Sequence, residues 1–114
     1  MSNMILVYTT CKDIREAKKI GRHLLKKRLC GCINILLEME SAYFWPQHSG
    51  EIETSRESVL LIKTLADRYE DVEREILKIH SYSNPSIFAL PVLAMSQKYL
   101  NPDFCKLVKF EKII

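Results

Sequence analysis

Residues 32–64 read CINILLEMESAYFWPQHSGEIETSRESVLLIKT, and this stretch decides the fold. Its first limb, residues 32–45, alternates between apolar and polar side chains. One face of that limb carries Ile33, Ile35, Leu37, Met39, Tyr43 and Trp45. A period of two is typical of a half-buried strand. Residues 46–50 supply turn-forming residues, and residues 51–64 return through an apolar run. The stretch therefore predicts two long strands joined by one turn.

The length of this hairpin has a consequence for assembly. A strand of about 13 residues spans roughly 43 Å, whereas a helix of about 15 residues covers only ~23 Å. Two such helices cannot shield the whole ribbon, and an isolated two-stranded ribbon is marginal in water. The distal aromatic residues Tyr43, Phe44 and Trp45 therefore need cover from outside their own domain, and another copy of the chain is the simplest source.

The segments around the hairpin have clear periodicities of their own. Residues 4–10 form an apolar, β-branched run that indicates a central strand, and residues 13–28 begin with a capping-box pattern and continue with helical spacing. A second apolar stripe predicts a helix over residues 64–79, followed by a strand over residues 87–94. Pro91 places this strand at a sheet edge or at a bulge, because proline cannot donate to a ladder. A C-terminal helix is expected from residue 97 onwards, interrupted at Pro102. The order β-α-β-β-α-β predicts an α+β, ferredoxin-like fold with one antiparallel sheet and two helices on one face.

The composition is that of an ordinary globular domain. The 114 residues are 47% hydrophobic and 27% charged, which suits a single domain spanning residues 1–114. A net charge of +3 is too small to indicate a nucleic-acid partner. No leader is expected, because the apolar run at residues 4–7 is short and no basic region precedes it. No stretch approaches the ~20 apolar residues of a membrane span, so a cytoplasmic protein without a membrane partner is expected. In that compartment the four cysteines are expected to be reduced.

The basic residues gather in one segment and the acidic residues in another. The cations of residues 12–28 are Lys12, Arg15, Lys18, Lys19, Arg22, Lys26, Lys27 and Arg28. The hairpin carries Glu38, Glu40, Glu51, Glu53 and Glu57. A solvated helix face explains the cations without any ligand, because a nucleic-acid surface would also carry interleaved aromatic residues.

Motifs for common enzyme chemistries are absent from the sequence. There is no nucleophile elbow, P-loop, H-E-x-x-H or G-x-G-x-x-G pattern, so no catalytic activity is expected. The side chains with reactive potential are Cys32, Lys63, His80 and Tyr82. A thiol and an imidazole can form a nucleophile pair or a soft metal site. The alternative is a strand cysteine and a helix-end histidine with no shared role.

Taken in order, several short motifs resemble the CutA family, the divalent-cation tolerance proteins. The resemblance covers residues 4 to about 100. It is carried by VYTT at 7–10, CIN at 32–34, the aromatic cluster at 43–45 before GEIE at 50–53, Glu57 with IKT at 62–64, His80-x-Tyr82-x-x-Pro85, LPV at 90–92 and Tyr99-Leu100. Where the family usually has His-Pro-Tyr followed by an acid or amide, this chain has Ser81 in place of the proline and Ser83 in place of the acid or amide, so one possible ligand is lost.

The resemblance implies a function and a set of site residues. It implies a homotrimer built through the long strands, a link to copper or another divalent cation, no required cofactor and no catalytic activity. The metal ligands would be Cys32, His80 and Glu57, in a cleft between subunits that Trp45, Lys63 and Tyr82 also line.

Two further interpretations remain open. The fold and the trimer also resemble the PII-like regulators, so a small-ligand or anion-binding signalling module, with the basic helix attracting the anion, is the first alternative. An enzyme using Cys32 or His80 is the second, and the missing catalytic signatures disfavour it.

Overall fold

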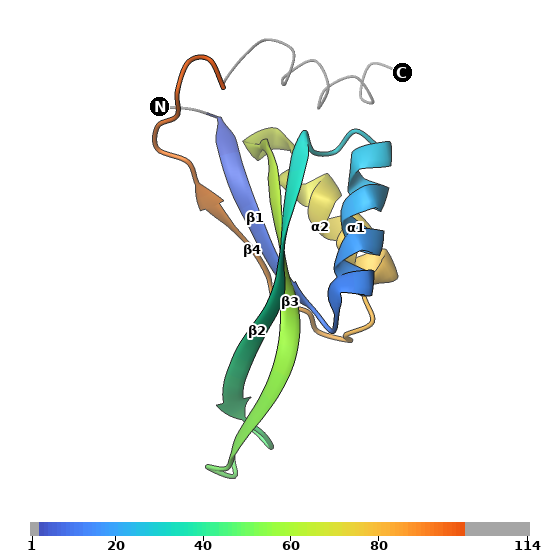
Figure 1. Cartoon of the computed structure of the whole chain (residues 1–114), viewed down its shortest axis with the longest axis vertical. Coiled ribbons are helices and arrows are strands. Elements are labelled where there is room, and N and C mark those ends of the chain that lie inside the picture. Colours follow the sequence, from blue (N-terminus) through green and yellow to red (C-terminus); the bar gives the residue numbers. More distant parts are fainter. Residues whose placement is uncertain (1–2, 100–114) are drawn as a thin grey trace.

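The computed structural model describes residues 3–99 and confirms the expected order of elements (Figure 1). The elements are β1 (Met4–Cys11), α1 (Ile14–Lys26), β2 (Cys32–Phe44), β3 (Ile52–Leu65), a 3₁₀ turn (Ala66–Arg68), α2 (Tyr69–Ile79) and β4 (Ile87–Pro91). The C-terminal helix expected beyond residue 97, with Pro102, falls almost wholly outside the described residues. No helix in the described part of the chain is long and apolar enough to cross a membrane.

The four strands form one antiparallel sheet in the order β2-β3-β1-β4, and both helices cover the same face (Figure 1). This is the predicted ferredoxin-like arrangement. β1 is central, with Val7 opposite Ile62 on β3 and Ala89 on β4. β4 is an edge strand and ends at Pro91, three residues before the predicted end. Proline has no backbone N–H, so it cannot donate to a further ladder bond.

The core lies between the sheet and the two helices. Val7, Leu60 and Ile62 from the sheet are fully buried. The helices contribute Ala17, Ile20, Leu24, Val72 and Ile76, which are also fully buried. These positions recur every three or four residues along each helix, so one face of each helix is removed from water.

The helix boundaries differ from the prediction at two places. α1 ends at Lys26, and Arg28 then adopts a left-handed conformation with φ of 58°, which turns the chain towards β2. α2 begins at Tyr69 and not near residue 64, because β3 continues through Leu65 opposite Met4. Pairing with β1 thus keeps the end of β3 extended.

A bulge in β2 changes which residues share a face in the distal hairpin. Leu36 lies opposite Val59, but Met39 already lies opposite Glu57, so β2 has one extra residue between them. An extra residue exchanges the two faces of a strand. The prediction that Met39 and Tyr43 continue the face of Ile33 is therefore wrong. Beyond the bulge Tyr43, Phe44, Trp45 and Ile52 are 44–68% exposed.

Candidate metal centre

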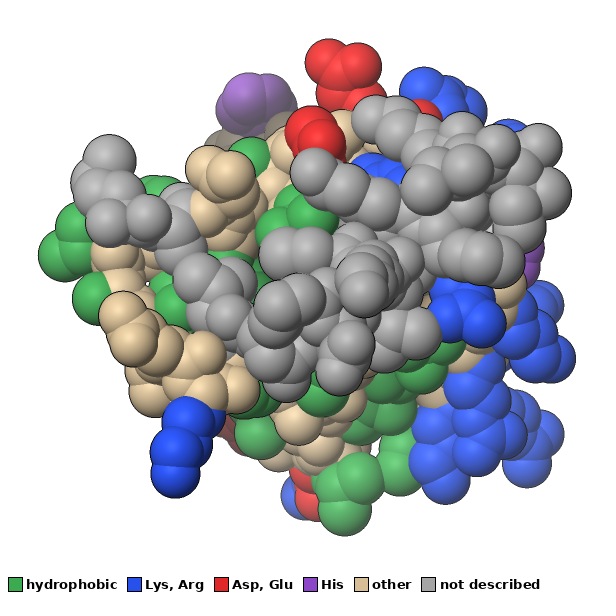
Figure 2. All heavy atoms as spheres, turned by 90° about the horizontal axis from the view of Figure 1, so that it is seen from above, with side chains coloured by type: hydrophobic (Ala, Val, Ile, Leu, Met, Phe, Trp, Pro, Cys, Tyr) green, Lys and Arg blue, Asp and Glu red, His purple; other side chains and the backbone are tan. Residues whose placement is uncertain are grey.

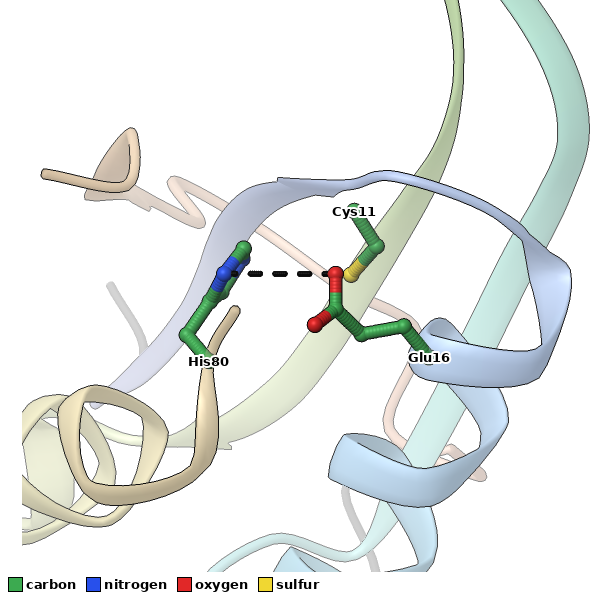
Figure 3. Close-up of side chains that lie close together, drawn as sticks. All are labelled: Cys11, Glu16 and His80. Atoms are coloured by element: carbon green, nitrogen blue, oxygen red, sulfur yellow. Dashed lines mark ion pairs between the residues drawn. The ribbon is translucent and has the colours of Figure 1, made fainter. Parts of the chain in front are cut away.

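Three potential metal ligands meet at one end of the sheet. Cys11 is the last residue of β1, Glu16 lies in the first turn of α1, and His80 directly follows α2. The thiol sulfur, a carboxylate oxygen and an imidazole nitrogen all lie within 4.8 Å of one another (Figure 3). Because α1 and α2 cover the same face of the sheet, the start of one helix and the end of the other meet there.

The cap of α1 fixes the carboxylate of Glu16. The Asp13 carboxylate accepts a hydrogen bond from the backbone N–H of Glu16 at 2.8 Å. Glu16 Oε1 accepts from the backbone N–H of Lys12, the residue before the N-cap, at 3.0 Å. Glu16 Oε2 accepts from the N–H of Ser81 at 2.9 Å, which ties α1 to the segment after α2. Burial would raise the pKa of Glu16, but the hydrogen bonds from Ser81 and Lys12 outweigh it and lower the pKa.

The hydrogen bonds of His80 fix its tautomer. Nε2 lies 2.8 Å from the carbonyl oxygen of Thr10, and a carbonyl only accepts, so Nε2 carries the proton. The backbone N–H of Tyr82 donates to Nδ1 at 3.1 Å. His80 is therefore a neutral imidazole whose single lone pair lies on Nδ1. This nitrogen is 4.0 Å from Glu16 Oε1, and the side chain is 0% exposed.

Cys11 supplies the sulfur of the group. The residue is fully buried. Burial raises the pKa of its thiol to about 12, and the negative charges of Glu16, Asp13 and Glu57 contribute in the same direction. The thiol is thus protonated in the absence of a cation. A bound metal ion must displace this proton, since the thiolate is the form that ligates metals.

This donor set suits a soft or borderline cation. Sulfur, imidazole nitrogen and carboxylate oxygen are the ligands of zinc and copper sites, whereas calcium and magnesium take oxygen. The hydrogen bond from His80 Nε2 to the Thr10 carbonyl is also the contact by which metal-binding histidines are usually oriented.

Three of the residues predicted from the sequence lie together: His80 belongs to this group, and Tyr82 and Glu57 lie beside it. The Tyr82 hydroxyl donates to Glu57 Oε2 on β3 at 2.7 Å. The rings of Tyr82 and His80 lie with their centroids 4.9 Å apart. Burial, followed by the Glu57 carboxylate, raises the pKa of Tyr82, so its phenol is protonated and donates.

The other three predicted residues lie elsewhere in the single chain. Cys32 and Lys63 are opposite each other at the far end of the hairpin's paired region. Lys63 lies over the ring of Tyr99, with Nζ 5.2 Å from the ring centroid. Along β3, Lys63 is six residues from Glu57, a distance of about 20 Å. Trp45, at the hairpin tip, is 59% exposed.

The sequence prediction missed Cys11 and Glu16 as possible ligands. The sequence shows the capping pattern of Asp13 and Glu16, but nothing in that pattern points towards His80, which is 64 residues after Glu16. Cys11 carries no local signal of a ligand, and in the described part of the chain Cys11, Cys30 and Cys32 are in no disulfide.

A comparison with models of protein families shows which family the chain belongs to. A family model described as CutA1 divalent ion tolerance protein matches residues 5–102. The chain belongs to the CutA1 family. The resemblance inferred from the short motifs is confirmed.

Curated relatives and solved structures agree with this assignment. The divalent-cation tolerance protein CutA of Thermotoga maritima is 39% identical over 98 residues, which cover 86% of this chain and 93% of the relative. That of Pyrococcus horikoshii is 37% identical over 97 residues, covering 85% and 91%. The structure of the Archaeoglobus fulgidus CutA superposes with a TM-score of 0.83 at 30% identity, over 92% of this chain and 98% of that one. These CutA1 relatives are named for tolerance of divalent cations and not for a reaction.

The comparisons contradict the expected cytoplasmic location. The Archaeoglobus fulgidus structure is described as a periplasmic CutA. A relative from Arabidopsis thaliana, 32% identical over 96 residues that cover 84% of this chain and 51% of the relative, is named chloroplastic. CutA1 proteins are thus assigned to more than one compartment, so the composition of the chain does not determine where it works.

Proposed function

We propose that this CutA1-family protein contributes to divalent-cation tolerance by binding a copper-type cation, without catalysing a reaction. The observation that carries the proposal is the convergence of Cys11, Glu16 and His80, whose ligand atoms lie within 4.8 Å of one another. Nδ1, the nitrogen of His80 that carries the lone pair, lies on the side of Glu16, and the Thr10 carbonyl holds the opposite nitrogen. The family's link to divalent cations points to the same role.

We further propose that the working form is a homotrimer. The support is the exposed apolar surface of the distal hairpin, where Tyr43, Phe44 and Trp45 are 44%, 56% and 59% exposed. Aromatic side chains bury about 150–250 Å² each. At ~25 cal/mol per Å², covering all three would contribute on the order of 10 kcal/mol before association costs.

A second arrangement of ligands uses Cys32 with His80 and Glu57. Within one chain Cys32 lies beside Lys63, well away from His80. This arrangement therefore requires a second copy of the chain to bring its Cys32 to the first copy's His80. The two arrangements share His80 and differ in the thiol, so variants of the two cysteines separate them.

The test is a titration of the reduced, metal-free protein with Cu²⁺ and with Zn²⁺, a redox-inert ion of similar ligand preference. His80→Ala and Cys11→Ser should weaken binding at least ~10-fold, and Glu16→Gln should weaken it less. Cys32→Ser is the matched control, since it removes a thiol outside the group. If Cys32→Ser weakens binding and Cys11→Ser does not, the intersubunit arrangement is correct. If none of the four variants changes binding, the proposed site is wrong.

The basic face of α1 favours a second candidate function, the binding of a small anion by a signalling module. Lys and Arg side chains gather along the side of the molecule where α1 lies (Figure 2). The exposed cations of α1 are Arg15, Lys18, Lys19, Arg22 and Lys26. A thermal-shift screen with nucleotides and inorganic phosphate tests this alternative, because a ligand of the native state raises the unfolding temperature.

A further inference from the structure

Two contacts join Tyr82 to the candidate metal centre, and a third anchors it to β3. Its backbone N–H donates to His80 Nδ1 at 3.1 Å, and its ring lies 4.9 Å from the imidazole, centroid to centroid. Its hydroxyl donates to Glu57 Oε2 at 2.7 Å. One residue thus occupies the imidazole nitrogen, packs against the imidazole ring and is anchored to β3.

The occupied nitrogen is the one that a metal ion needs. A neutral imidazole has a single lone pair, and here it lies on Nδ1 because Nε2 donates its proton to the Thr10 carbonyl. That lone pair cannot accept the Tyr82 N–H and bind a cation at the same time. Glu16 differs, because each carboxylate oxygen has two lone pairs. It can keep its bonds from Lys12 and Ser81 and still ligate a metal.

We propose that Tyr82 is a gate on the metal centre, held closed by Glu57, and that its backbone must move away before His80 can bind a cation. This inference rests on the proposed function, because it concerns access to the same ligands. In the closed form Tyr82 and the cation compete for Nδ1. The apparent affinity is then the intrinsic affinity multiplied by the fraction of molecules in which the gate is open. Loosening the anchor at Glu57 raises that fraction.

The role assigned to Glu57 therefore differs from that of a ligand. As an anchor it weakens metal binding, whereas as a ligand it would strengthen it. Removing the Tyr82 hydroxyl separates the anchor from the metal centre without changing any charge. The expected result for Tyr82→Phe is tighter binding of Zn²⁺, by about 10-fold, which corresponds to ~1.4 kcal/mol.

The binding experiment uses the reduced full-length protein and Zn²⁺ alone. Tyr69→Phe is the matched control, because Tyr69 donates a similar bond to Glu73 at 2.9 Å on α2. Circular dichroism and thermal unfolding of the metal-free variants establish that they are folded. If Tyr82→Phe binds Zn²⁺ as tightly as the parent or more weakly, the gate is refuted.

A double variant distinguishes an anchor from a ligand at Glu57. Once Tyr82→Phe has removed the bond, adding Glu57→Gln should change the affinity less than ~3-fold, since the two changes act on one contact. If Glu57→Gln instead cancels the gain of Tyr82→Phe, Glu57 is a ligand and the gate is refuted.

Amide hydrogen exchange tests the movement itself. On binding Zn²⁺, the backbone amide of Tyr82 should exchange faster, because its acceptor is taken by the metal. The amides of Lys12 and Ser81 should keep their protection, because Glu16 retains both bonds. An unchanged Tyr82 amide in the zinc-bound protein overturns the proposal. Failure of the parent to bind Zn²⁺, or undiminished binding by His80→Ala, would instead refute the proposed function.

Discussion

Glu75 on α2 joins the two helices, and Glu75→Gln is expected to weaken this link. The residue is 7% exposed. Its carboxylate accepts from His23 Nε2 on α1 at 2.8 Å and from Lys78 Nζ at 2.9 Å. Lys27 Nζ, also from the α1 side, lies 3.8 Å away. The variant removes the charge that all three partners share while keeping the shape of the side chain.

The size of the effect follows from the pKa of Glu75. The hydrogen bonds from His23 and then Lys78 lower it to about 2. A carboxyl with a pKa of about 4.3 in the unfolded chain would then stabilise the fold by about 3 kcal/mol near neutral pH. The partner side chains are 31–59% exposed. Solvent screening at these exposed cations reduces the expected value to about 1–2 kcal/mol.

The pH dependence gives the sharper test. Because the pKa of Glu75 is lowered on folding, the stabilisation is fully present above about pH 4.5 and is lost as the pH falls towards about 2. Urea unfolding, followed by circular dichroism at one protein concentration, should show the parent more stable than Glu75→Gln at neutral pH. This difference in the free energy of unfolding should disappear as the pH falls towards about 2. Glu70→Gln, an exposed acid on the same helix, is the control. A gap that is constant between neutral and strongly acidic pH refutes the reasoning.

Three shorter predictions concern the hairpin, the basic helix and a buried hydroxyl. Trp45→Asp should dissociate the proposed trimer, because it places a charge on the exposed aromatic surface; sedimentation equilibrium of parent and variant measures this, and a variant that stays trimeric contradicts it. Lys18→Glu combined with Lys19→Glu should change the free energy of unfolding by less than ~0.5 kcal/mol, since both side chains are exposed; a larger loss in urea unfolding assigns them a structural role. Thr64→Val should cost about 1–3 kcal/mol in the same assay, because its buried hydroxyl donates to the Leu29 carbonyl at 2.6 Å; an unchanged midpoint shows that the bond contributes nothing net.

The local pattern of apolar and polar residues was sufficient to predict the order of the helices and strands. The buried face of each element is indicated by the spacing of its apolar residues, both in the alternation from Cys32 onwards and along the two helices. This spacing is a property of residues that are close in sequence. The proline of β4 likewise carries its own signal, since it lacks an N–H wherever it stands. The fold class followed from these signals, and so did the family, through short motifs in a fixed order.

Two features of the backbone depended on pairing between strands. The bulge between Leu36 and Met39 appears only when β2 is set against β3, and it reverses the faces predicted for the distal hairpin. α2 starts at Tyr69, later than the sequence predicted, because pairing with β1 keeps the end of β3 in the sheet. Pairing with a distant strand outweighs local helical spacing. The sequence of a single strand does not show which strand it pairs with or in which register.

The candidate metal centre was decided by the tertiary structure. The sequence offered His80 as a ligand, but Cys11 and Glu16 join it only because α1 and α2 pack on the same face and their ends meet. The family resemblance also implied that Cys32 and His80 share a cleft between subunits, and within one chain the register of the sheet separates them. Whether the lone pair of His80 is free or occupied by the amide of Tyr82 depends on contacts of about 3 Å. Such contacts are set by how distant segments pack, and the spacing of residues along the chain does not specify them.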